Sequence, residues 1–135
     1  MFNIGIDFGS TYTTVSAYRN ETEKLETVVL GLGTPYIPTI AGGKVGSLDG
    51  LRYGSAAKGI MGRKDHVLYK AFKMLLTEKK TELLRERGYT EEITPAVVAE
   101  KFLTDLIQRV LEHYGEKEID HVVIGAPEIW FKGVD

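Results

Sequence analysis

A short stretch near the start of the chain combines one carboxylate with a turn of small and hydroxyl-bearing residues. Asp7 is followed two residues later by Gly9, Ser10, Thr11 and Tyr12. A glycine lets the backbone approach a phosphate closely, and successive backbone N–H groups form a concave anion-binding nest to which hydroxyls add donors. A carboxylate at the edge of such a nest can hold hydrated Mg²⁺ or orient a water. The stretch therefore predicts a loop that binds the phosphates of a nucleotide.

Two strand-like runs flank this turn. Ile4 and Ile6 alternate with Gly5 before it, and Val15 and Ala17 resume an extended pattern after it. This alternation is typical of strands, so we expect a β-hairpin that carries the chemistry at its tip. The turn lacks the lysine of a Walker A loop and no helix follows it, which indicates a different phosphate-binding design.

The six residues from Asp7 to Tyr12 (DFGSTY) resemble the first phosphate motif of the ATPase superfamily that includes actin, hexokinase and heat-shock chaperones. Three further segments resemble DnaK-type chaperones, in the same order along the chain. They are residues 37–40 (IPTI), similar to the "IPS" strand, 53–58 (YGSAAK), similar to the "GxxAK" helix start, and 124–127 (IGAP), similar to the "VPA" strand end. Over nearly its whole length the chain thus resembles the N-terminal part of the ATPase domain of a DnaK-like chaperone of the seventy-kilodalton heat-shock family.

The resemblance implies a role for each residue of the turn. Asp7 matches the family aspartate that lies near Mg²⁺ and the attacking water, which implies metal binding through waters. Ser10 and Thr11 match positions whose backbone and hydroxyls contact the β- and γ-phosphates. Tyr12 takes part through its backbone N–H, and Gly9 completes the nucleotide-binding turn. The implied ligands are ATP or ADP with Mg²⁺.

Lys73 is the second expected catalytic residue after Asp7. Residues 72–75 (FKML) resemble the family's "AKRLIG" segment, whose lysine reaches the γ-phosphate. An ammonium group placed there stabilises charge on the transferring phosphoryl oxygens. Met74 and Leu76 depart from the pattern, so an ordinary solvated lysine stays open as an interpretation. Lys70 lies three residues earlier on the same expected helical face, and we prefer Lys73 to Lys70.

Pro127 resembles the family proline that couples the nucleotide state to the partner domain. The competing interpretation is a proline that only ends a strand. The sequence continues with Glu128, Ile129 and Trp130 and has no arginine after Pro127, unlike the family pattern. Both interpretations of Pro127, the coupling proline and the strand-ending proline, stay open.

The resemblance implies that the intact protein is an ATP-hydrolysing molecular chaperone of the stress response. Hydrolysis would drive a conformational change in a peptide-binding domain that acts on unfolded peptide clients with co-chaperones. Residues 1–135 are expected to be a fragment of the first lobe, without the second lobe and the peptide-binding domain. We therefore expect the 135-residue chain by itself to bind ATP weakly and to hydrolyse it negligibly.

Three alternatives stay open. A sugar or acetate-type kinase shares the first phosphate motif but transfers the phosphoryl group to a substrate, and the GSAAK and IPTI segments disfavour it. An actin-like filament protein would use the nucleotide to control polymerisation, and it would sediment with ATP. A degenerate nucleotide-binding module used only for interaction is kept open by the poor match around Lys73.

The composition is that of an ordinary folded chain. Of the 135 residues, 43% are hydrophobic and 27% charged, and the net charge is −2. Lysines and arginines are scattered along the sequence, which argues against nucleic-acid binding. The chain has no cysteine, which excludes disulfides and thiolate chemistry and fits a reducing compartment. No apolar run reaches membrane-spanning length and no signal-peptide pattern is visible, so we expect a cytoplasmic protein without a membrane partner.

The pattern of the whole chain predicts an α/β fold with a mixed β-sheet, in which an antiparallel meander is followed by a helix that crosses over to a buried strand. The resemblance implies that this is the ribonuclease H-like lobe of an actin-like ATPase. The expected strands are 2–8, 13–19, 25–30, 36–40, a weak edge pair around Asp49-Gly50, and 118–125. The expected helices are 55–61 with Ser55 as its cap, 65–76 continuing through 78–87 to Gly88, and one from Thr94-Pro95 to Gly115.

Overall fold

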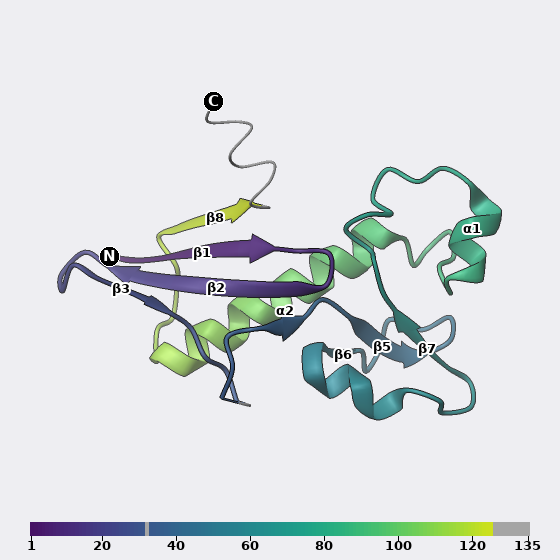
Figure 1. Ribbon diagram of the computed structural model, residues 1–135, viewed down its shortest axis with the longest axis horizontal. Coiled ribbons are helices and arrows are strands. Elements are labelled where there is room, and N and C mark those ends of the chain that lie inside the picture. Colours follow the sequence, from purple (N-terminus) through teal and green to yellow (C-terminus); the bar gives the residue numbers. More distant parts are fainter. Residues whose placement is uncertain (32, 126–135) are drawn as a thin grey trace. The chain divides into compact units, whose positions relative to one another are not determined.

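A computed structural model describes residues 1–31 and 33–125 of the chain (Figure 1). They form a mixed α/β structure with two compact units. The first unit consists of Met1–Ile37 and the segment from Leu106 onward, and the second is Pro38–Asp105. The second unit is therefore inserted into the chain of the first. No helix among the described residues has both the length and the apolarity needed to cross a membrane.

The first unit is built on a mixed sheet with the strand order β3-β2-β1-β8 (Figure 1). Strands β1, β2 and β3 pair antiparallel as a meander, β8 is parallel to β1, and the short β4 pairs with β2. Parallel neighbours need a crossover, and the long helix α2 precedes β8 in the chain. The expected meander, crossover helix and parallel last strand are therefore confirmed. The bounds are β1 Phe2–Phe8, β2 Tyr12–Arg19, β3 Lys24–Thr27, β4 Ile37–Pro38, β8 His121–Gly125 and α2 Pro95–Tyr114.

Strict alternation along β1 decides which residues enter the core. Phe2, Ile4, Ile6 and Phe8 are buried, whereas the residues between them are partly exposed. Successive strand residues point to opposite faces of a sheet, so Asp7 lies on the face opposite this apolar row. The ring of Phe2 lies 5.3 Å from the ring of Tyr114 at the end of α2, which packs that end of the helix against the buried face.

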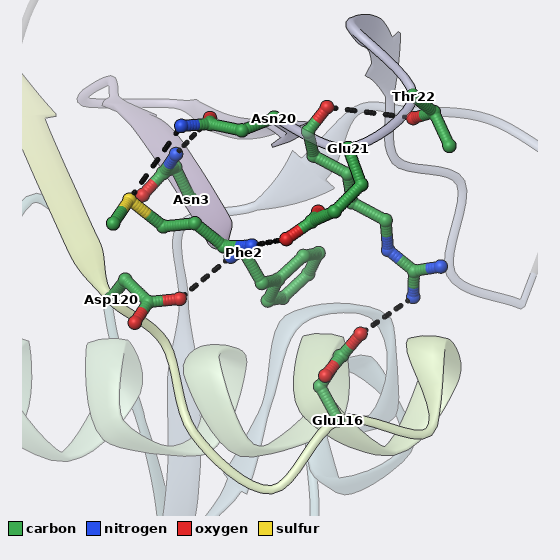
Figure 2. A network of polar contacts seen from close by, with 9 residues as sticks. Phe2, Asn3, Asn20, Glu21, Thr22, Glu116 and Asp120 are labelled. Atoms are coloured by element: carbon green, nitrogen blue, oxygen red, sulfur yellow. Dashed lines mark hydrogen bonds and ion pairs between the residues drawn. The ribbon is translucent and has the colours of Figure 1, made fainter.

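A network of polar contacts stabilises the sheet at the end away from the β1–β2 turn (Figure 2). The α-ammonium of Met1 pairs with Glu21. The N–H of Phe2 donates to Oδ2 of Asp120 at 2.7 Å, and the N–H of Asp120 donates to the carbonyl of Phe2 at 2.8 Å. Because Asp120 immediately precedes β8, this reciprocal pair fixes the register of the parallel strand at its first residues.

Arg19 connects the meander to the end of α2. Its guanidinium lies over the rings of Phe2 and Tyr114, at 5.5 and 5.6 Å from their centroids, and Nη2 pairs with Glu116 at 2.9 Å. A hydrogen bond from the hydroxyl of Tyr114 lowers the pKa of Glu26, and the charges of Lys24 and Arg19 lower it further. Burial, together with the Glu26 carboxylate, raises the pKa of Tyr114 to about 12.

Tyr114→Phe should change the response of the protein to alkali. Free tyrosine titrates near pH 10, so between about pH 10 and 12 the folded protein holds the Tyr114 proton more tightly than the unfolded chain does. The wild type therefore loses stability as the pH rises through this window, and the Phe variant should lose less. Urea unfolding at increasing pH measures the difference. An NMR titration should also show a higher pKa for Glu26 in the variant, and an unchanged Glu26 would contradict the Tyr114 contact.

The second unit contains a small antiparallel sheet with the strand order β6-β5-β7 and two short helices. Its core is aromatic: the ring of Phe72 lies 5.5 Å from that of Phe102, and the ring of Tyr69 lies 5.2 Å from that of Tyr89. The hydroxyl of Tyr89 donates to the carbonyl of Lys70 at 3.0 Å. The bounds are β5 Ala41–Lys44, β6 Arg52–Tyr53, the 3₁₀ helix η1 Gly54–Ile60, β7 His66–Tyr69 and α1 Thr81–Glu86.

Two helix predictions in this unit are wrong in part. The expected helix over 65–76 is instead strand β7 followed by turns. Asp65 and Ala71, which flank β7, have positive φ values of 61° and 53°, a backbone conformation that an α-helix excludes. Helical structure between 78 and 87 shrinks to Thr81–Glu86, although Gly88 follows it at φ 91° as expected of a helix stop. At η1 no side chain caps the helix, so Ser55 is not its cap.

The long helix was predicted correctly at both ends, and the last strand only in its position. The hydroxyl of Thr94 accepts from the N–H of Val97 at 3.2 Å, as an N-cap does. Gly115 follows α2 at φ 65°. Strand β8, however, was expected to be buried on both faces, and Val122, Val123 and Ile124 are 39%, 48% and 47% exposed. An apolar run does not by itself reveal whether a strand is central or at the edge of its sheet.

Candidate functional site

The β1–β2 hairpin brings five of the six predicted site residues together in or beside one turn. Strand β1 ends at Phe8 and β2 begins at Tyr12, so Gly9, Ser10 and Thr11 form the connection. The register pairs Phe8 with Thr13. Ser10 and Thr11 are exposed, so their hydroxyls and backbone groups are open to a ligand.

Gly9 is required by the geometry of this turn. A Cβ atom at Gly9 would lie 2.3 Å from the carbonyl oxygen of Tyr12, a backbone atom, and real Cβ atoms do not come so close. The carbonyl group of Tyr12 therefore folds back over Gly9 in a turn that only glycine permits. The close approach of the Gly9 backbone to a phosphate, which the sequence predicted, stays a prediction.

Asp7 occupies a protected place beside the turn. In the sheet it lies between Thr14 of β2 and Gly125 of β8. Its Oδ1 atom is buried and has no hydrogen-bond partner among the described residues. Leaving a buried acceptor without a partner costs about 1–3 kcal/mol. Such a group is expected to have a partner from outside the chain, such as a water or a hydrated cation.

Tyr36 is a residue of this region that the sequence reasoning missed. Its ring lies 6.0 Å from the ring of Tyr12 in an edge-to-face arrangement, and the two residues are 59% and 50% exposed. The pair forms an aromatic surface beside the β1–β2 turn. No local signal could have identified it, because Tyr36 lies in the loop before β4, far from the turn in the chain.

Lys73 lies outside the hairpin, in the second unit. It is partly buried within the turns that span 72–77, and Lys70 is exposed just after β7. The two lysines were expected on one face of a helix, which this segment does not form. The hairpin site therefore consists of Asp7 and the turn residues, and Lys73 belongs to a different compact unit. Pro127, for which a coupling role was predicted, lies outside the described residues.

The number of ligating side chains at the site limits which cations it could hold. Among residues 1–31 and 33–125, no group of three or more His, Asp or Glu side chains is placed to hold a metal ion directly. Asp7 alone suits a cation that keeps most of its water shell. Mg²⁺ behaves in this way, because it gives up its waters reluctantly and is commonly held by one or two carboxylates together with substrate phosphates.

Comparisons with known proteins give no independent assignment. A scan against protein-family models found no match to the chain, and a search of curated proteins found none either. The functional inference therefore depends on the residues of the hairpin, on their geometry and on the motif resemblance.

Proposed function

We propose that the β1–β2 turn binds the phosphates of Mg²⁺·ATP, and that the chain is the N-terminal part of the ATPase domain of a DnaK-like chaperone. One observation carries the proposal: a buried carboxylate oxygen of Asp7 without a hydrogen-bond partner lies beside a turn that only glycine permits. Buried acceptors normally have a hydrogen-bond partner, and a water of a hydrated cation would supply one to this oxygen.

Each residue of the turn would have a separate role in binding Mg²⁺·ATP. The backbone N–H groups and hydroxyls of Ser10 and Thr11 and the N–H of Tyr12 would hold the β- and γ-phosphates. Asp7 would accept hydrogen bonds from waters, including those of the cation and the attacking water. Mg²⁺, when bound, would neutralise the phosphate charge that hydrolysis develops. The resemblance alone assigns Lys73 a charge-stabilising role at the γ-phosphate, and this role stays a prediction.

The fold is compatible with this assignment. We propose that the specific fold is the ribonuclease H-like lobe of an actin-like ATPase. The order of elements expected of such a lobe is an antiparallel meander, a helix and a last strand parallel to β1. In the intact chaperone, ATP hydrolysis would drive changes in a peptide-binding domain that acts on unfolded clients with co-chaperones. We propose the cytoplasm as its location, in keeping with the absence of cysteine.

The test is a titration of the ¹⁵N-labelled chain with Mg²⁺·ATP, followed by NMR. We expect weak binding that shifts the amide signals of Ser10, Thr11 and Tyr12 and that depends on Mg²⁺. Asp7→Asn should remove the Mg²⁺ dependence. It should also raise the free energy of unfolding by about 1 kcal/mol, because a neutral amide replaces a charged group with a buried, unsatisfied oxygen.

Asp49→Asn is the matched control, since Asp49 is exposed in the second unit and the substitution changes the charge equally. This variant should bind like the wild type. Turnover of ATP by the chain alone should be negligible. Shifts that are absent from the turn, or equal in the Asp7 and Asp49 variants, would overturn the proposal.

A further inference from the structure

The second unit carries an excess of positive charge that nucleotide binding does not use. Between Lys44 and Lys80 the sequence has nine lysines and arginines against three aspartates and glutamates. In sequence these cations are scattered, which argued against nucleic-acid binding. The fold gathers five of them around the small sheet. We call this set the basic patch: Lys44, Arg52, Lys58, Arg63 and Lys64.

Backbone pairing and turns bring these residues together. Lys44, the last residue of β5, pairs in register with His66 of β7. The N–H of Val45 donates to the carbonyl of Asp65 at 3.0 Å, so the end of β5 adjoins the connection that carries Arg63 and Lys64. That connection leaves η1, where Lys58 lies. Arg52 lies on β6, which pairs with β5, and its Nη1 atom is 3.8 Å from the point where a Cβ atom on Gly59 of η1 would lie.

The cations of the basic patch are not neutralised within the chain. All five residues are exposed, and none of their side chains forms an ion pair or a side-chain hydrogen bond with another described residue. The ion pairs Met1–Glu21, Arg19–Glu116 and Lys24–Glu26 lie in the first unit. One acidic residue, Asp65, lies at the same connection as Arg63 and Lys64, so the cations outnumber the carboxylates there. Clustered like charges repel one another, so an arrangement of this kind favours a negatively charged partner.

Two exposed apolar side chains accompany the basic patch and narrow the class of partner. Val45, next to Lys44, is 62% exposed, and Met61, directly after η1, is 60% exposed. Methionine adapts its shape to varied apolar partners and is common in protein-binding surfaces. Nucleic-acid surfaces instead combine cations with exposed aromatic rings for base stacking. The aromatic residues next to the patch, Tyr53 and His66, are partly buried, whereas its exposed neighbours Val45 and Met61 are not aromatic.

We propose that the basic patch, with Val45 and Met61, docks an acidic segment of a partner protein that carries apolar residues between its carboxylates. The carboxylates would pair with the five cations, and the apolar residues would cover Val45 and Met61. The surface belongs to the second unit and requires neither the β1–β2 turn nor a nucleotide. The inference therefore stands or fails separately from the proposed ATPase function.

Fluorescence anisotropy with a labelled peptide of Glu-Glu-Leu repeats tests the docking surface on the full chain. We expect saturable binding that weakens about tenfold when NaCl is raised from about 0.05 to about 0.3 M, because salt screens the charge pairs. The variant Lys58→Glu/Arg63→Glu/Lys64→Glu should weaken binding at low salt by at least about tenfold. The neutral variant Lys58→Gln/Arg63→Gln/Lys64→Gln should bind the peptide with an affinity between those of the wild type and the charge-reversed variant. It is the control for misfolding of the charge-reversed chain.

Lys79→Glu/Lys80→Glu/Lys101→Glu is the control, since it changes the net charge equally at exposed positions outside the basic patch. It should retain most of the binding. A Glu-Glu-Ser peptide, which lacks the apolar residues, should bind more weakly than the Glu-Glu-Leu peptide. Equal weakening by both triple reversals would overturn the proposal, as would an absence of peptide binding. Tighter binding of a single-stranded oligonucleotide would also overturn it, in favour of a nucleic-acid surface.

Discussion

Gly9→Ala should abolish the response of the β1–β2 turn to Mg²⁺·ATP while the rest of the sheet stays folded. The new methyl group would meet the carbonyl oxygen of Tyr12 at 2.3 Å. A backbone atom cannot rotate away as a side chain can, so the turn itself must open. Opening it displaces the N–H groups of Ser10, Thr11 and Tyr12, which we propose hold the phosphates. The overcrowding should lower the free energy of unfolding by about 2 kcal/mol. NMR titration and urea unfolding measure the two effects.

Gly5→Ala is the matched control for this prediction. Gly5 lies in β1 of the same hairpin, but a Cβ atom there would meet nothing within 4 Å. Alanine also loses less conformational freedom than glycine on folding, so this variant should be as stable as the wild type or up to about 1 kcal/mol more stable. It should bind Mg²⁺·ATP normally. If Gly9→Ala still showed the ligand shifts at Ser10 and Thr11, the close approach at Gly9 would have no part in phosphate binding.

The hairpin could be predicted because its signals are local. The alternation of Phe2, Ile4, Ile6 and Phe8 determines both the strand and the face it buries. The turn residues follow directly in the chain, so Asp7 and Gly9 could be placed in one site from sequence alone. Helix α2 is predictable for the same reason, because Thr94 and Pro95 at its start and the glycine after its end are local signals.

The region around β7 could not be predicted, because its structure depends on distant partners. Val67, Leu68, Ala71 and Phe72 show a spacing that fits a helix, but β7 pairs with β5, and Phe72 packs against Phe102 of α2. Strand pairing of this kind overrides local preference. The positive φ of Ala71 has no sequence signal, since alanine rarely adopts it.

The same reason explains what was missed at the site and in the second unit. The contact of Tyr36 with Tyr12 and the exposure of β8 are set by the arrangement of segments that are distant in sequence. The basic patch likewise exists only after β5, β6 and the η1–β7 connection come together. Charge counted along the chain showed scattered lysines and arginines, and the fold places five of them around the small sheet.

Gly88→Ala should cause the largest loss of stability that we expect from a single methyl group in the second unit. Gly88 has φ 91°, where an alanine is strained, and its Cβ atom would lie 2.3 Å from Cγ2 of Val67 in β7. Valine has few alternative rotamers, so the clash cannot be relieved by a simple rotation. Left-handed strain of about 1–2 kcal/mol and overpacking of about 1–3 kcal/mol should together lower the free energy of unfolding by about 3 kcal/mol.

Gly62→Ala separates the two contributions. Gly62 has a similar φ of 80°, but a Cβ atom there would meet nothing within 4 Å. This variant should carry the backbone strain alone and lose about 1 kcal/mol. The difference between the variants in urea unfolding then measures the contact with Val67. Gly88→Ala/Val67→Ala should recover part of that difference, because the second change removes the obstructing methyl groups. If the two glycine variants lose equal stability, the packing of Gly88 against β7 makes no contribution to the second unit.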